Sequence, residues 1–318
     1  MAENYLEPIV LERADPWVYK HTDGYYYFTG SKPGYQEIEL RRAKTLSGLS
    51  HCETKIVWHA HKSGPMSHLI WAPEIHFIRG KWYIYFAASD HAEIRDEKHH
   101  HRMFVIENTH EDPFEGEWQE KNQIKTQIES FSLDATTFEH KNRLYYVWAQ
   151  ADPNIPGNSN LYLSEMENPW TLKGKQTLLS IPYYDWETIE FKVNEAPAVI
   201  TRNGKVIVTY SASATDENYA MGLLWADEES DLLNGYSWHK VETPVFSSSE
   251  KNARYGPGHN SFTVDEEGQR DILVYHARPE KNTHGNPLEN PNRHAYIQSF
   301  TWNEDGLPYF GEPGELRQ

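Results

Sequence analysis

The sequence contains a single cysteine, Cys52, among 318 residues. One thiol can form neither an intrachain disulfide nor a metal cluster built from thiolates, so both are excluded. No window approaches the roughly 18 apolar residues that a membrane-spanning helix needs, so we expect no membrane partner. The amino-terminal residues lack the basic segment and apolar core of a secretory signal, which predicts a soluble, cytoplasmic protein. Removal of a signal would leave the same sequence, so secretion stays open.

Basic side chains are also scarce, with 30 Lys and Arg against 47 Asp and Glu, which gives a net charge of −17. The phosphate backbone of a nucleic acid would be repelled by this charge, so we expect no nucleic-acid partner. A neutral ligand such as a sugar meets no such penalty. Aromatic residues are abundant, at 14% of the chain, and this indicates a folded protein rather than a disordered one.

Long helical periodicity is missing, and short apolar runs recur instead. The runs are YYYFTGS from Tyr25, YIYFAAS from Tyr83, LYYVWAQ from Leu144, VIVTYSA from Val206 and ILVYHAR from Ile272. They begin roughly sixty residues apart, and most follow a turn signal such as Asn203-Gly204. A second short segment precedes each run. Each repeat therefore predicts a strand, a turn and a second strand, with room for further strands.

Five all-β units of similar length predict a five-bladed β-propeller that spans residues 1–318 as one domain, with four-stranded blades around a central channel. The alternative is a large β-sandwich, which would not explain the repeat. The polar tract Glu97–Arg102 (EKHHHR) predicts a solvated loop, and a metal-binding His cluster is the alternative.

Polar residues open these units at similar distances ahead of the second strand. Asp15, Asp134, Glu195 and His259 occupy this position in four units, and Ala72 occupies it in the second. In a propeller the first strands line the channel, so we expect these side chains to meet at one end of the axis. Each residue alone has an ordinary explanation, for example Asp15 as the cap of a turn before Pro16.

Carboxyl groups brought together without cations repel one another, and this repulsion raises the pKa of at least one of them. The arrangement does not stabilise a fold, but a catalytic site can use the raised pKa. Glycoside hydrolysis needs one protonated and one ionised carboxyl group. Glu195 in the apolar, proline-containing segment NEAP is the candidate for the protonated one. Tyr and Trp side chains can stack on the C–H faces of sugar rings, which agrees with the aromatic content.

The segments RADPWVYKHTDGYYYFTGS, WAPEIHFIRGKWYIYFAAS, SLDATTFEHKNRLYYVWAQ and VNEAPAVI together resemble family-43 glycoside hydrolases. The resemblance covers nearly the whole chain and implies an inverting enzyme with its active site at one end of a five-bladed propeller. It is greatest to the exo-acting α-L-arabinofuranosidases of that family, which implies 1,5-linked arabino-oligosaccharides as substrate. By the same resemblance, Asp15 is the general base, Glu195 the general acid, and Asp134 the carboxylate that tunes and orients the acid.

Further candidates are less specific. The resemblance places His259 beside a bound ion, often calcium, through water, whereas a buried, hydrogen-bonded histidine is the alternative. No cofactor is expected for the chemistry. Arg278, and Arg293 in NPNRH, are candidates for binding sugar hydroxyls, although Arg278 could instead form a structural ion pair. Trp71 is a candidate for the wall of the sugar pocket or for packing between blades. We expect His276 to belong to the core of its blade.

Three functions stay open at this point. The first is an exo-arabinofuranosidase, and the second is a β-xylosidase or endo-arabinanase built on the same fold. The third, from a different class, is a propeller that binds sugars without hydrolysing them. Three carboxyl groups at one site argue against the third, because binding a neutral sugar does not need an acid of raised pKa. Linkage, chain length and oligomeric state do not follow from the sequence.

Overall fold

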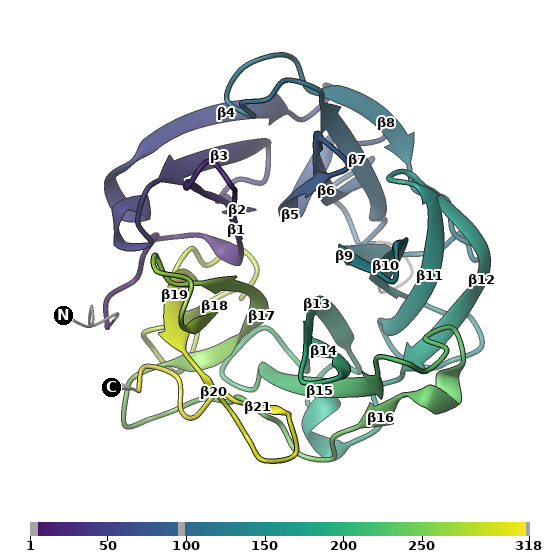
Figure 1. The fold of residues 1–318 in the computed structure, drawn as a ribbon, viewed down its shortest axis with the longest axis vertical. Helices are drawn as coiled ribbons and strands as arrows, with labels where there is room; N and C mark the ends of the chain where they lie inside the picture. Colours follow the sequence, from purple (N-terminus) through teal and green to yellow (C-terminus); the bar gives the residue numbers. More distant parts are fainter. Residues whose placement is uncertain (1–5, 95–98, 316–318) are drawn as a thin grey trace.

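Five sheets surround a central axis in the computed structural model, which describes residues 6–94 and 99–315 (Figure 1). The first strand of each sheet lies nearest the axis, and later strands lie progressively outward (Figure 1). The predicted all-β, five-bladed propeller is therefore confirmed. None of the helices in the described part of the chain is long and apolar enough to cross a membrane.

The blades follow chain order, and each is an antiparallel meander. The first comprises β1 (Ala14–Lys20), β2 (Tyr26–Ser31), β3 (Glu37–Ala43) and β4 (Glu53–His59), and the second β5 (His68–Ile78), β6 (Lys81–Ser89), β7 (Arg102–Asn108) and β8 (Gln119–Gln123). The third comprises β9 (Ser132–His140), β10 (Arg143–Gln150), β11 (Asn160–Asn168) and β12 (Thr171–Ser180), and the fourth β13 (Asn194–Arg202), β14 (Lys205–Ala212), β15 (Ala220–Asp227) and β16 (His239–Lys240).

The fifth blade has three strands in its sheet, not the expected four: β17 (Tyr255–Val264), β18 (Asp271–Arg278) and β19 (His294–Ser299). A short hairpin of β20 (Thr301–Trp302) and β21 (Pro308–Tyr309) follows. The described residues also form three 3-10 turns: η1 (Ser47–His51), η2 (Asp185–Glu187) and η3 (Gly235–Ser237).

The amino-terminal segment joins the two ends of the ring. The backbone N–H of Ile9 donates to the carbonyl of Ala295 in β19 at 2.8 Å, and the N–H of Ala295 donates to the carbonyl of Val10 at 2.9 Å. Figure 1 shows the first and the fifth blade as neighbours in the ring. Residues 9 and 10 thus extend the last blade, which closes the ring.

The predicted turns lie where the sequence places them. Arg202 pairs with Lys205 across Asn203-Gly204, and these two central residues have φ values of 53° and 73°. A two-residue hairpin turn of this type needs positive φ at both central positions, which explains the preference for Asn-Gly. The second strands, such as β6 and β14, are buried almost throughout, because the neighbouring blades cover both of their faces.

A β-bulge interrupts the pairing of every innermost strand near the same end of the axis. At each bulge one residue other than glycine has a positive φ: Asp15 (55°), Ala72 (46°), Asp134 (45°), Ala196 (54°) and His259 (43°). Bulges re-aim side chains and are common next to active sites. The position equivalent to Asp15 in the fourth blade is therefore Ala196, so the sequence alignment that placed Glu195 there was wrong by one residue.

Side chains of the preceding blade hold the N–H groups of these bulge residues in four of the five blades. The acceptors are Ser31 Oγ for Ala72 (2.8 Å), Asp134 Oδ2 for Ala196 (3.2 Å), Ser211 Oγ for His259 (2.9 Å) and His276 Nδ1 for Asp15 (3.1 Å). A buried N–H without a partner would be costly, so these bonds fix each bulge against its neighbour. The ring is thereby tied together around the axis where the polar residues gather.

Candidate active site

A cavity of about 380 Å³ lies at this end of the axis. Its walls include almost all of the candidate residues predicted from the sequence: Asp15, Trp71, Asp134, Glu195, His259 and Arg293. These residues come from all five blades, so only the closed ring brings them together. Arg278 is the exception, because it is not among the residues that line the cavity.

Asp15 is buried and surrounded by cationic groups. Its Oδ1 lies 3.1 Å from Nδ1 of His259 and 3.6 Å from Nη1 of Arg293, and its Oδ2 accepts a hydrogen bond from the hydroxyl of Ser31. Burial alone would raise the pKa of Asp15, but His259 and Arg293 outweigh it and hold the pKa well below the ordinary value. Asp15 is therefore ionised at neutral pH.

Glu195 has the opposite environment. Burial, and then the nearby charge of Asp134, raise the pKa of Glu195 to about 8, and His259 only partly opposes them. Burial also raises the pKa of Asp134, whose Oδ2 lies 3.7 Å from Nδ1 of His259. The two carboxyl groups titrate as a coupled pair, and Glu195 is the member that keeps its proton to higher pH.

His259 is held by the carboxyl groups. Burial alone would lower its pKa, but Asp15, Asp134 and Glu195 raise it to about 9. Calcium prefers oxygen ligands, so the imidazole of His259 is a poor direct ligand for it. In this structure His259 is paired with the carboxylates of Asp15 and Asp134. An ion held beside His259 through water stays a prediction, and we assign no step to a metal.

Two residues that the sequence did not assign to the site complete it. The hydroxyl of Tyr219 donates to Oε1 of Glu195 at 2.8 Å, and its ring stacks on His276 at a centroid distance of 5.5 Å. His276 is buried, as expected, but it also accepts a hydrogen bond from the backbone N–H of Asp15. Burial lowers the pKa of His276 to about 4, so its ring is neutral and can accept this bond. A buried Tyr or His resembles ordinary core in a sequence, which is why neither was assigned to the site.

The two predicted arginines have different positions. Arg293 contacts Asp15 and donates to the hydroxyl of Tyr35 at 3.1 Å, so it lies in the cavity wall. Arg278 donates to the carbonyl groups of Thr215 and Pro287 and to Oδ1 of Asn290. Pro287 lines the cavity. Arg278 therefore supports the segment that forms the cavity wall instead of lining the cavity itself, and its contacts include no ion pair with a carboxylate of the described residues.

Trp71 lines the cavity and also packs between side chains. Its indole stacks on the ring of His101 at 3.9 Å, and His99 meets its edge at 5.0 Å. His101 is fully buried, and His99 is half-buried in the cavity wall. The expectation of a solvated loop is therefore wrong for these two histidines, because the indole covers them; Glu97 and Lys98 lie outside the described residues.

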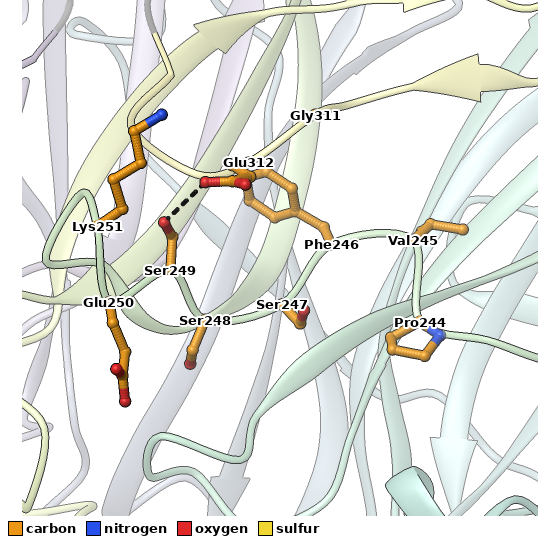
Figure 2. A pocket seen from close by; sticks show the side chains of 10 residues that line it. All are labelled: Pro244, Val245, Phe246, Ser247, Ser248, Ser249, Glu250, Lys251, Gly311 and Glu312. Atoms are coloured by element: carbon orange, nitrogen blue, oxygen red, sulfur yellow. Dashed lines mark hydrogen bonds between the residues drawn. The ribbon is translucent and has the colours of Figure 1, made fainter.

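A second hollow, of about 460 Å³, lies between the segment that leads from β16 to β17 and the segment that follows β21 (Figure 2). Residues 244–251 form one wall, and Gly311 and Glu312 form the other, where Ser249 donates to Glu312 at 3.1 Å. None of the bulge residues lines this hollow. It thus lacks the convergence of carboxyl groups that distinguishes the axial cavity.

Comparison with known proteins agrees with this geometry. The family model described as glycosyl hydrolases family 43 matches residues 5–308. This chain belongs to family 43 of the glycosyl hydrolases. The predicted resemblance is thus confirmed.

Several named proteins are similar to this chain over most of its length. An extracellular exo-α-(1→5)-L-arabinofuranosidase of Streptomyces avermitilis is 51% identical over 97% of this chain, and one of Streptomyces chartreusis is 50% identical over 89%. The chain spans 63% of the length of the first relative and 85% of the second. The crystal structure of an α-L-arabinofuranosidase from Lactobacillus brevis is 56% identical, with a TM-score of 0.97 and 98% coverage of both chains.

These relatives overturn one expectation. Both Streptomyces proteins are named as extracellular, which contradicts the cytoplasmic location expected from the sequence. The expectation depended only on the composition of the amino-terminal residues. The composition of these residues does not determine the location of the protein.

Proposed function

We propose that this family 43 protein is an inverting glycoside hydrolase that releases L-arabinofuranose from 1,5-linked arabino-oligosaccharides. One observation carries the chemistry: a single cavity holds Asp15, whose pKa is lowered, and Glu195, whose pKa is raised. An inverting glycosidase needs this pair of protonation states at neutral pH. The names of the three relatives support arabinofuranosides as the substrate class.

The proposed reaction uses both carboxyl groups in one step. Glu195 gives its proton to the glycosidic oxygen as the bond to the anomeric carbon breaks. A water molecule on the opposite face of the sugar attacks that carbon and gives a proton to Asp15. The step ends with Glu195 ionised and Asp15 protonated, and exchange of protons with water restores the starting state.

The remaining groups would act on these two. Asp134 keeps the pKa of Glu195 high by its negative charge, and its bond to the N–H of Ala196 fixes the backbone next to the acid. His259 and Arg293 keep Asp15 ionised and limit its orientations. A carboxylate of low pKa is a weak base. Asp15 would therefore contribute mainly by orienting the water, which becomes more acidic as it attacks the anomeric carbon and can then give its proton to Asp15.

The alternatives are less well supported. No observation in the cavity favours xylose over arabinofuranose, and the relatives of about 50% identity are named for arabinofuranosides. A propeller that only binds sugar would not need a half-buried glutamic acid next to a second buried carboxyl group, because that arrangement costs free energy. Oligomeric state has no bearing on this choice.

Initial rates on 4-nitrophenyl α-L-arabinofuranoside and 4-nitrophenyl β-D-xyloside test the proposal, followed by 1,5-arabino-oligosaccharides. We expect a clear preference for the arabinoside and release of the monosaccharide from oligosaccharides. A preference for the xyloside would refute the substrate, and internal cleavage of linear arabinan would refute exo action. Proton NMR of the first product formed would reveal retention, if it occurs, and so contradict the inverting mechanism.

A further inference from the structure

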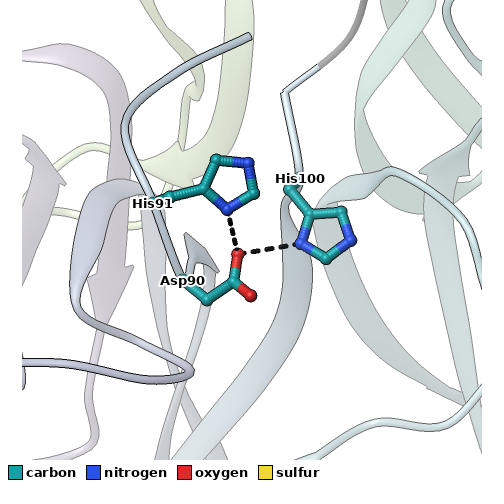
Figure 3. Close-up of side chains that lie close together, drawn as sticks. All are labelled: Asp90, His91 and His100. Atoms are coloured by element: carbon teal, nitrogen blue, oxygen red, sulfur yellow. Dashed lines mark hydrogen bonds and ion pairs between the residues drawn. The ribbon is translucent and has the colours of Figure 1, made fainter. Parts of the chain in front are cut away.

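Three side chains of types that can bind metals lie close together beside the cavity, and none of them has a role in the proposed reaction. Oδ1 of Asp90 is 2.5 Å from Nδ1 of His91 and 2.8 Å from Nδ1 of His100 (Figure 3). One ligand atom from each of the three residues lies within 4.8 Å of the others. The two imidazole rings stack at 5.1 Å, so both point their Nδ1 atoms to the same carboxylate oxygen.

We propose that Asp90, His91 and His100 bind a zinc ion. Two imidazoles and one carboxylate are a ligand set that zinc accepts, with a water in the fourth position. Zinc would replace the protons that now lie between the carboxylate and the rings, and these protons would pass to water. Asp90 and His100 are exposed and His91 is partly buried, and small rotations suffice because the donor atoms already converge. The net charge of −17 favours a cation on this surface.

The position of the site gives it a consequence for the cavity. Asp90 and His91 directly follow β6, whereas His100 lies just before β7. Residues 92–99 connect the two sides, and Ile94 and His99 of this connection line the cavity. A zinc ion bound to both ends would hold these wall residues in place. This consequence rests on the proposed function; the binding of zinc does not.

Zinc should therefore affect the binding of substrate more than the transfer of protons. Ile94 and His99 are not among the groups that contact Asp15 or Glu195. Ile94 is 60% exposed at the cavity and can contact a bound oligosaccharide. We expect zinc to lower KM for arabino-oligosaccharides severalfold and to leave kcat on the nitrophenyl arabinoside unchanged.

Isothermal titration calorimetry with zinc chloride tests the site directly, on the full chain without an affinity tag. We expect one zinc ion per chain. The double variant His91→Ala, His100→Ala should lose at least about 100-fold in affinity, since even supporting residues of metal sites contribute 10–100-fold. His61→Ala is the matched control, because His61 pairs with the carboxylate of Glu120 at 2.8 Å outside this group. Absence of binding, or equal binding by the double variant, would overturn the proposal.

Kinetics with added zinc or with a chelator tests the consequence. A lower KM with zinc in the wild type, unchanged in the double variant, would support it. An unchanged KM in a protein that binds zinc by calorimetry would overturn the link to the cavity. If no glycoside is hydrolysed, the proposed function fails, while calorimetry still decides whether zinc binds.

Discussion

Asp15 and Glu195 are carboxylic acids in the same cavity, yet their neighbours move their pKa values in opposite directions. His259 and Arg293 surround Asp15, whereas Glu195 has Asp134 as its charged neighbour. A shift of one unit corresponds to about 1.4 kcal/mol between the two protonation states. The division of labour that we propose is thus set by contacts made across several blades, and not by the residue types.

Glu195→Gln should abolish the proton donor without changing the size of the side chain. We expect kcat on 1,5-arabino-oligosaccharides to fall by about 10²–10⁴-fold, with a smaller loss on the nitrophenyl arabinoside, whose leaving group needs little protonation. Steady-state kinetics on both substrates measures this difference. Glu190→Gln is the control, since Glu190 also lines the cavity. Equal losses on both substrates would contradict the role of Glu195 as acid.

Tyr219→Phe should shift the alkaline limb of the pH profile upward. The rate falls as pH rises through the pKa of Glu195, about 8, because the acid loses its proton. The hydroxyl of Tyr219 stabilises the ionised form, so its removal raises this pKa, by up to about one unit for a hydrogen bond of 0.5–1.5 kcal/mol. The pH dependence of kcat on an oligosaccharide measures the shift.

Tyr210→Phe is the matched control for this prediction. Its hydroxyl also donates to a glutamate, Oε1 of Glu187 at 2.8 Å, but neither residue lines the cavity. We expect no shift of the alkaline limb in this variant. A downward shift in Tyr219→Phe, or the same shift in both variants, would show that the tyrosine does not act through Glu195.

The sequence was sufficient to find the three carboxyl groups, although Asp15 and Asp134 each have an ordinary explanation when taken alone. Glu195 interrupts an apolar strand, and Asp15 and Asp134 recur at one phase of the repeat. Tyr219 could not be found in this way, because its role depends on an atom of a different strand. Arg278 was placed in the wrong position for the same reason: its strand ends near the axis, but its guanidinium turns to the segment of Pro287 and Asn290.

At the scale of the strands, the bulges explain why the site forms at this end of the axis. The equivalent bulge residue of each innermost strand has a positive φ there, and a side chain from the preceding blade holds its N–H in four blades. The repeat and the Asn-Gly turn predicted the strands well, since both are local patterns. The bulge is also local, but it adds one residue to the strand and so shifts the alignment of the repeats by one position. The sequence alignment therefore matched Glu195 to Asp15, although the residue equivalent to Asp15 is Ala196.

Ser211→Ala should weaken the fold at one of these contacts. It leaves the buried N–H of His259 without its acceptor, which costs about 1–3 kcal/mol. Urea unfolding measures the change in the free energy of unfolding. Ser50→Ala is the control, because the hydroxyl of Ser50 bonds to the carbonyl of Ser47 at the surface. If both variants lose equal stability, the contact between blades has no special importance.

The whole ring depends on a contact that leaves no local pattern in the sequence. Residues 9 and 10 pair with β19 from the far end of the chain, and their side chains join the apolar cluster that contains Ile272 and Val274. Loop closure over almost the whole chain cannot be predicted from periodicity, because the two partners lie at opposite ends of the sequence and no local pattern links them. The fifth blade was therefore expected to have four strands of its own.

Ile9→Ala tests this closure. Ile9 is 4% exposed, and truncation of a buried Ile to Ala typically costs 2–5 kcal/mol. Its neighbour Leu11 is 62% exposed, so Leu11→Ala provides a matched control that should change stability by less than about 0.5 kcal/mol. Urea unfolding of both variants gives the two values, and loss of activity should accompany unfolding in Ile9→Ala, because residues of all five blades line the cavity. Equal and small effects would mean that the ring is held by the packing of its five blades, and that the amino-terminal pairing only covers its edge.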